Sequence, residues 1–291
     1  MLEGYLFAFG SAIFSAFAAI LEKKILFKDK ALSFSFLLGF FNFIISIPFF
    51  FFIDYHSLTL ISLFVLFFKS FLGAISFVCV MLAIKDLEIS KALPMLILTP
   101  GLVAVFAFLI LGDVLSFFEI IGILFLLIGT YVLQLGGKLD FLTPVKKLFS
   151  SKGNKYIFIA LFLFTTTSIL DKALLSKFKI QVNAFFAFQH LFLAIIFLVI
   201  VLVSKDYSEI KKTIKYSWRA IFILSFITLS YRYLQILAVK LIPVALVLSI
   251  KRLSVFFAII IGGRIFKDKN LFIRILATIV MLIGAILIIV L

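Results

Sequence analysis

The chain has 291 residues, of which 65% are hydrophobic and only 14% are charged, and it carries a formal net charge of +15. Soluble domains are about 45–50% apolar and about 25% charged, so this composition excludes a soluble fold, which could not bury so much apolar surface. The lysines and arginines are spread over short intervals rather than gathered in a basic arm. This distribution argues against nucleic acid as a partner and leaves the lipid bilayer.

Apolar runs long enough to cross a bilayer recur along the whole chain, separated by short polar breaks. A helix needs about 20 residues to cross the ~30 Å hydrocarbon layer, whereas a β-barrel strand would alternate polar and apolar residues. The sequence therefore predicts an all-α integral membrane protein with ten transmembrane helices. We expect them near residues 4–22, 33–53, 59–84, 92–111, 118–135, 156–177, 183–203, 217–238, 243–263 and 271–291.

The longest polar interval, residues 137–155, follows the fifth expected helix and contains Pro144 and a Ser-Ser-Lys-Gly-Asn run. Such a composition is typical of a linker. It divides the chain into a first five-helix repeat, residues 1–136, and a second, residues 156–291. Because each half holds an odd number of helices, the second is expected to be inverted relative to the first. Inverted repeats around a central cavity are typical of transporters, with the solute site between the repeats.

Two matches between the halves support a duplication. Residues 20–23 (Ile-Leu-Glu-Lys) are echoed by residues 169–172 (Ile-Leu-Asp-Lys). Residues 83–136 also align without a gap on residues 238–291, and this alignment pairs Asp113 with Asp268 and Gly129 with Gly284.

The ten short helices, the duplication and the pattern at the end of each half resemble the EamA domains of the drug/metabolite transporter superfamily. The pattern is Leu111-Gly112-Asp113 followed by Gly122 and Gly129, and its copy is Phe266-Lys267-Asp268 followed by Ala277 and Gly284. Family members usually carry Glu where this chain has Asp113 and Asp268. The resemblance covers essentially the whole chain. It implies a ten-helix transporter with a central cavity, in a superfamily that exports amino acids and other metabolites, carries nucleotide sugars and exchanges phosphorylated sugars.

Basic residues deep within the expected helices are the strongest candidates for a solute site, because a charge at the bilayer centre costs roughly 2.5–3.5 kcal/mol and usually faces a cavity or a partner. Lys251 and Arg252 lie in the middle of the ninth expected helix, where they point about 100° apart and could converge on one anion. The pair is similar to the Lys-Arg pair that grips phosphate on the ninth helix of triose-phosphate transporters. Alternatively, Arg252 pairs with a carboxylate of another helix and Lys251 reaches the membrane interface.

Other polar residues at membrane depth complete the candidate substrate-binding set. They are Tyr231, Arg232, Tyr233 and Gln235 in the eighth expected helix, Gln189 and His190 in the seventh, Asn42 in the second and Lys69 in the third. A tyrosine beside a cation suits a sugar or a phosphate ester, although Arg232 could instead brace a neighbouring helix. His190 could be a structural residue, and Lys69 could extend to the interface.

Acidic residues near helix ends are expected to be structural. Glu22 with Lys23, and Asp171 with Lys172, occupy equivalent helix ends, where they predict gate or junction salt bridges rather than solute contacts. Asp113 and Asp268 precede the fifth and tenth expected helices, where a carboxylate is favoured at a helix N-terminus. The sequence contains no phosphate loop, no HExxH and no metal-ligand spacing, so we expect neither an enzyme nor a cofactor.

These patterns predict a transporter that moves a small anionic metabolite by alternating access. An amino-acid or drug exporter with an aromatic cavity, or a membrane subunit without transport activity, remain as alternatives. We expect a multi-pass protein of a cell membrane, and we favour a prokaryotic inner membrane. We also expect the protein to act as a monomer or weak homodimer. Most lysines and arginines follow odd-numbered helices. The positive-inside rule places those intervals in the cytoplasm and both termini outside, whereas the family resemblance implies termini inside.

Overall fold

A computed structural model describes residues 2–88, 92, 95–99, 102, 116–135, 152–205, 207–242 and 244–290. Every regular element in these ranges is helical, as the composition predicts. The elements are α1 (Leu2–Leu26), α2 (Ala31–Ser46), η1 (Ile47–Phe52), η2 (Tyr55–Ser57), α3 (Leu60–Asp86), η3 (Leu96–Leu98), α6 (Phe117–Leu135), α8 (Lys152–Ser176), α9 (Val182–Ser204), α10 (Tyr207–Leu241), α11 (Val244–Ile265) and α12 (Leu271–Val290). Within these described ranges, six helical segments are long and apolar enough to cross a membrane.

Two helices begin earlier than the sequence predicts. α10 starts at Tyr207 rather than near residue 217, and α8 starts at Lys152, inside the expected linker. The first turns of α10 contain Glu and Lys, which favour helix, and neither Pro nor Gly. Most of the expected fourth helix, residues 92–111, lies outside the described residues, as do Asp113 and most of the linker. The count of ten helices therefore stays a prediction.

Local sequence signals explain where α2 ends and where α3 begins. α2 gives way to the tighter helix η1 at Ile47, because Pro48 lacks the N–H that an α-helix interior requires. α3 begins after Thr59, whose hydroxyl oxygen accepts a hydrogen bond from the backbone N–H of Ser62 at 3.2 Å. This bond satisfies one of the free N–H groups of the first turn.

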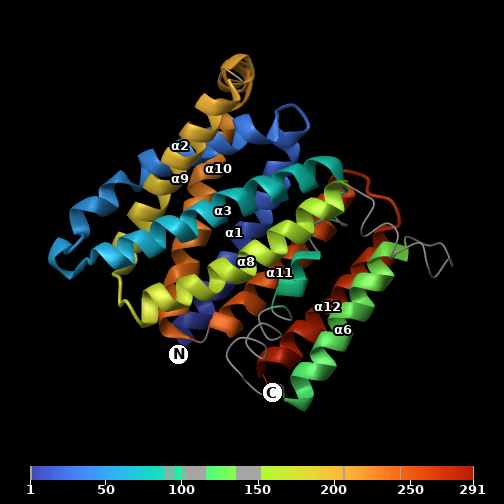
Figure 1. Cartoon of the computed structure of the whole chain (residues 1–291). Coiled ribbons are helices and arrows are strands. Elements are labelled where there is room, and N and C mark those ends of the chain that lie inside the picture. The colour runs from blue at the N-terminus through green and yellow to red at the C-terminus, as the bar shows by residue number, and fades with distance from the viewer. Residues whose placement is uncertain are drawn as a thin grey trace.

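The helices pack as a bundle in which α1 lies against α10 and α11, while α3 runs alongside α8 and also contacts α9 (Figure 1). Small residues on α1 allow this close approach: Ala8, Ala12 and Ala16 are almost fully buried. The Ser11 hydroxyl also donates to the Tyr231 carbonyl of α10 at 2.9 Å. α1 is therefore an interior helix of the bundle.

α6 and α12 form a separate pair at one edge of the bundle (Figure 1). Glycines hold them close together. A Cβ added at Gly284 would lie 2.6 Å from the Gly122 carbonyl oxygen and 2.8 Å from the Phe125 Cβ. One added at Gly129 would lie 2.9 Å from the Ala277 carbonyl oxygen. Each glycine therefore allows its own helix to approach the backbone of the other.

The outer surface of the bundle is apolar. Leu60 is 87% exposed, and Phe64, Phe117 and Phe272 are each at least 70% exposed. Soluble monomers rarely expose large contiguous apolar patches, so these side chains face lipid.

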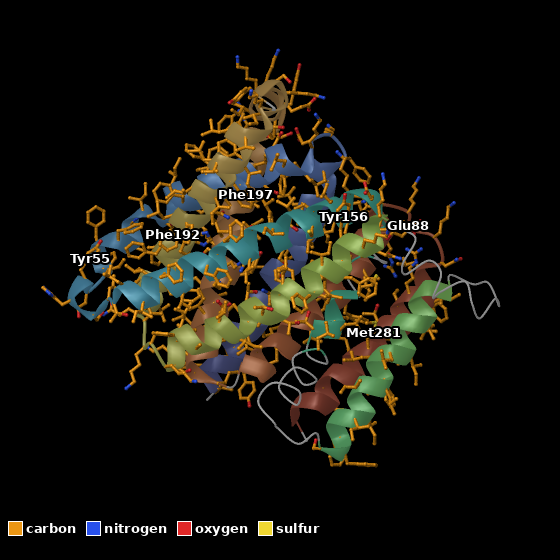
Figure 2. The ribbon with its side chains drawn as sticks, in the orientation of Figure 1. Tyr55, Glu88, Tyr156, Phe192, Phe197 and Met281 are labelled. Atoms are coloured by element: carbon orange, nitrogen blue, oxygen red, sulfur yellow. The ribbon has the colours of Figure 1, made fainter. Side chains whose placement is uncertain are left out.

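The two ends of α3 mark two different ends of the bundle, with Tyr55 near one and Glu88 near the other (Figure 2). At the Glu88 end, here called the basic end, polar contacts join the turn after α1, the C-terminus of α3 and the starts of α10 and α12. The Lys85 ammonium donates to the Asp29 carbonyl at 3.0 Å, and the Ser217 hydroxyl donates to the Asp29 carboxylate. Glu88 forms an ion pair with Arg274.

We expect the basic end to face the cytoplasm, since short basic loops stay on that side. Lys28 is exposed at this end, and Asp54 is exposed at the other. Cysteines placed singly at Lys28 and at Asp54 in a Cys79→Ala background are to be labelled on intact cells with an impermeant thiol reagent. Labelling is expected at residue 54 and not at residue 28, and the reverse result would show that the orientation is inverted.

Candidate central site

A cavity of about 210 Å³ lies between the helices. It receives side chains from α1, α2, α3, α8, α9, α10 and α11, including residues from both expected halves of the chain. Ten of the residues selected from the sequence line it: Glu22, Asn42, Lys69, Asp171, Gln189, His190, Tyr231, Arg232, Gln235 and Lys251. Residues that are far apart in sequence thus meet in a single polar space inside an apolar bundle.

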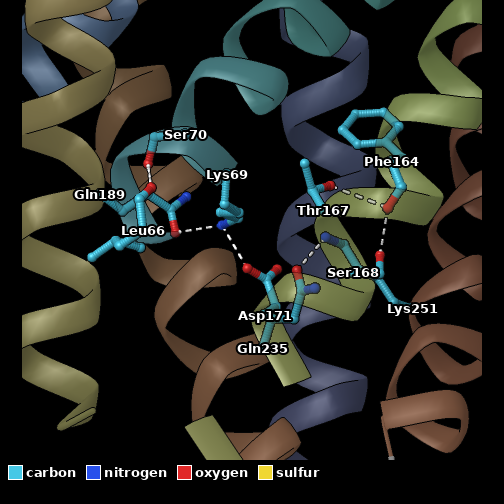
Figure 3. A network of polar contacts seen from close by, with 10 residues as sticks. All are labelled: Leu66, Lys69, Ser70, Phe164, Thr167, Ser168, Asp171, Gln189, Gln235 and Lys251. Carbon is cyan, nitrogen blue, oxygen red and sulfur yellow. Dashed lines mark hydrogen bonds and ion pairs between the residues drawn. The ribbon is translucent and has the colours of Figure 1, made fainter. Parts of the chain in front are cut away.

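Lys69 forms the centre of one polar cluster (Figure 3). Its ammonium lies 2.7 Å from the Asp171 carboxylate of α8 and donates to the Gln189 side-chain oxygen of α9 at 2.9 Å. The same ammonium lies 4.8 Å from the ring centre of Phe185. The Lys69 side chain is only 5% exposed, so it does not extend to the interface. A buried charge of this kind requires a partner, and Asp171 supplies it.

A second cluster surrounds Tyr231. The Lys251 ammonium lies 4.9 Å from the centre of the tyrosine ring, and the Arg232 guanidinium lies 5.8 Å from it. Lys251 also donates to the side-chain oxygen of Gln235 (Figure 3). Glu22, on α1, is 6% exposed and lines the same cavity as Arg232 and Lys251. The wall of this cavity therefore holds two cations from α10 and α11 and one carboxylate from α1.

Some polar side chains in the cavity wall have unused hydrogen-bonding capacity, among them His190, which is 2% exposed, and Asn42, which is 5% exposed. Within the part of the chain that the structure describes, neither imidazole nitrogen of His190 has a hydrogen-bond partner, and neither does the side-chain oxygen of Asn42. Leaving a buried polar group unsatisfied costs about 1–3 kcal/mol, so these atoms are suited to a bound polar molecule.

Tyr233 lies outside the lining of the central cavity. It packs against Phe49 and Phe186, and its hydroxyl donates to Asn183 at 3.3 Å. The side chains of Lys172 and Arg252 lie outside the described part of the structure.

Lys23 lies at the basic end, where its ammonium donates to the backbone carbonyls of Ile84, Lys85 and Leu87. It also lines a second cavity of about 240 Å³ with Asp268 and Glu88. Its neighbour Glu22 faces the central cavity instead, as does Asp171. The sequence predicts that Glu22, Lys23 and Asp171 are structural residues at helix ends. The position of Lys23 fits this prediction, whereas Glu22 and Asp171 line the central cavity.

Hydroxyl side chains in the cavity wall were not selected from the sequence. They are Ser15, Ser35, Ser70, Thr167, Ser168, Thr228 and Ser254. Their spacing could have identified them. Ser15 precedes Glu22 by two helical turns and Ser35 precedes Asn42 by two turns, so each serine lies on the same helix face as its partner. Several of these hydroxyls donate to their own helix, as Ser35 does to the Ala31 carbonyl at 2.8 Å. Their oxygens can still accept a hydrogen bond.

Comparison with known proteins identifies the family. The model of the EamA-like transporter family matches residues 2–135 and 151–290. The chain belongs to the EamA-like transporter family. The EamA protein is therefore a multi-pass membrane transporter that handles a small solute, and members of this family are transporters rather than enzymes.

A comparison with solved structures agrees on the fold. One crystal structure, described only as that of a protein, superposes on this EamA protein with a TM-score of 0.66 at 14% sequence identity. The match covers 98% of this chain and 95% of that chain. The comparison with curated proteins found no match.

Proposed function

We propose that this EamA protein carries a small anionic metabolite across the membrane by alternating access, and that Arg232 and Lys251 bind the anionic group. The observation that carries the proposal is the placement of both cations around Tyr231 in the wall of the central cavity. A guanidinium can bind two oxygens of a carboxylate or phosphate at once, and an ammonium beside it adds a point charge.

The charge balance of the cavity supports an anionic solute. Lys69 and Asp171 form an ion pair, so they neutralise each other. Among the other ionisable side chains described in the lining, Arg232 and Lys251 face one carboxylate, that of Glu22. This leaves one positive charge in excess, which favours a negatively charged occupant in a site of low dielectric.

The uncharged part of the cavity indicates what else the solute carries. The Asn42 oxygen and the serine and threonine oxygens are acceptors, and neutral His190 offers one acceptor and one donor. Such a wall binds a solute that has several O–H or N–H donors more tightly than it binds a purely apolar solute. The aromatic lining residues, Phe77, Phe164 and Phe197, supply the apolar surface that a drug-like solute would use.

Alternating access is supported by reciprocal packing of the halves. In each case a hydrogen bond joins the first helix of one half to the third helix of the other. Ser11 of α1 donates to the Tyr231 carbonyl of α10, and Ser76 of α3 donates to the Ala160 carbonyl of α8 at 3.1 Å. The cavity lining also repeats. It includes Ser15, Ala18, Ala19 and Glu22 on α1, and Phe164, Thr167, Ser168 and Asp171 on α8. The two sets have identical spacing, as two copies related by a pseudo-two-fold axis would have.

The proposal predicts that Lys251→Gln and Arg232→Gln each weaken binding of the solute about ten- to a hundredfold, because each removes a charge-assisted hydrogen bond. Purified protein is first screened by thermal stabilisation against phosphate esters, carboxylates, amino acids and organic cations. The compound that stabilises the wild type is then titrated against both variants and followed by uptake into proteoliposomes.

Lys240→Gln is the matched control, since Lys240 is an exposed residue at the end of α10 that does not line the cavity. It is expected to bind the solute as the wild type does. Stabilisation by cations alone, or unchanged anion affinity in both site variants, would contradict the anion site and favour the exporter alternative.

A further inference from the structure

Among the described residues of the cavity lining, Glu22 carries a buried charge to which the proposed function assigns no direct part in binding. Its side chain extends from the last turns of α1 into the space that Arg232 and Lys251 also line. It differs from Asp171, which is held by Lys69 at 2.7 Å. Glu22 instead shares the cavity wall with the two residues proposed to bind the solute. An anion that enters the cavity therefore meets the same two cations that Glu22 already faces.

A fixed negative charge beside an anion site changes affinity according to the charge of the ligand. Each negative charge of the ligand is attracted by Arg232 and Lys251 and repelled by Glu22. Because Coulomb energies scale with the product of the charges, a second negative charge on the ligand adds a second attraction by the cations and a second repulsion by Glu22, so Glu22 offsets more of the attraction for a dianion than for a monoanion. With Glu22 ionised, the Tyr231 cluster carries one net positive charge, which a monoanion neutralises and a dianion exceeds.

We propose that Glu22 sets the charge selectivity of the site, by lowering the advantage that a dianion would otherwise have over a monoanion of the same shape. The inference rests on the proposed anion-binding function and assigns Glu22 a role in specificity. Glu22 also acts as the resident counter-ion of Arg232 and Lys251 when the cavity holds no solute. It thereby limits the cost of keeping two cations in an empty, buried space.

The test uses two ligands of one scaffold, succinate as the dianion and monomethyl succinate as the monoanion. Affinities are measured by thermal stabilisation of the purified full-length protein at about pH 8, where free carboxylates are ionised. The quantity compared between variants is the ratio of the two affinities, which an ionised Glu22 is expected to shift toward monomethyl succinate. Glu22→Gln keeps the shape and removes the charge, and we expect it to shift the affinity ratio about tenfold toward succinate.

Two further variants separate charge selectivity from a structural role. Glu22→Asp keeps the charge and is expected to keep the wild-type preference. Lys251→Gln removes a cation and is expected to shift the ratio the opposite way, toward the monoanion, which tests the proposal even if Glu22→Gln does not fold. An unchanged ratio in a folded Glu22→Gln protein that still binds both anions would overturn the role of Glu22 alone. Stabilisation of none of these proteins by either anion would overturn the anion site, and this inference with it.

Discussion

Asp171→Asn is expected to lower the free energy of unfolding by about 3–5 kcal/mol, because it leaves the Lys69 ammonium buried without a counter-charge. Lys69 is 5% exposed and makes its ion pair at 2.7 Å, whereas Asp171 is 27% exposed on the cavity side. Lys69→Met leaves the more exposed partner unpaired and should cost less. The double variant Lys69→Met/Asp171→Leu should recover most of the loss, since it leaves no uncompensated charge. The measurement is reversible unfolding in mixed detergent micelles.

The chain offers a matched control in the ion pair between Lys30 and Glu209. Its atoms are 3.6 Å apart and its side chains are 52% and 27% exposed. Exposed pairs contribute about 0–1 kcal/mol, so Lys30→Gln should change the stability very little. If Asp171→Asn were no more destabilising than Lys30→Gln, the Lys69 charge could not be as buried as described.

Gly284→Ala is expected to destabilise the protein by about 1–3 kcal/mol through overpacking. The added methyl would meet the Gly122 carbonyl oxygen at 2.6 Å and the Phe125 Cβ at 2.8 Å, and backbone atoms cannot turn aside as a flexible side chain can. Helix propensity alone predicts the opposite sign, since alanine favours a helix interior by about 1 kcal/mol over glycine. The sign of the change in unfolding midpoint therefore decides between packing and propensity.

Gly73→Ala is the control for this substitution, because a Cβ at Gly73 would meet nothing within 4 Å. It should be neutral or slightly stabilising. If both alanine variants gained stability, α6 and α12 could not be as close as the glycines indicate.

Periodicity and hydropathy predicted the helices well because lipid imposes one simple requirement, a long apolar run for each crossing. The same reliance on hydropathy explains why the sequence predicts the start of α10 near residue 217 rather than at Tyr207. Residues 207–216 are polar and were assigned to a loop by hydropathy, but a helix outside the membrane needs only local propensity and contacts such as that between Lys30 and Glu209.

The cavity residues were predictable one by one but not as pairs. A charge deep in a helix can be recognised from sequence alone, and Lys69, Arg232 and Lys251 were selected on that basis. The partner depends on how helices from different parts of the chain are placed. Nothing in one sequence indicates that Lys69 meets Asp171, or that Glu22 and Lys23, adjacent on α1, face two different cavities.

The length of α10 fixes the depth at which the bundle sits in the bilayer. Its 35 residues span roughly 52 Å at 1.5 Å per residue, well beyond the ~30 Å hydrocarbon layer. Trp218, 43% exposed and 5.5 Å from the Arg219 guanidinium, is the kind of side chain that anchors at the headgroup level. The turns before it carry exposed Lys211, Lys212 and Lys215. We expect these lysines to lie at the level of the lipid phosphates, where anionic lipids attract basic side chains and hold this end of the helix at a fixed depth.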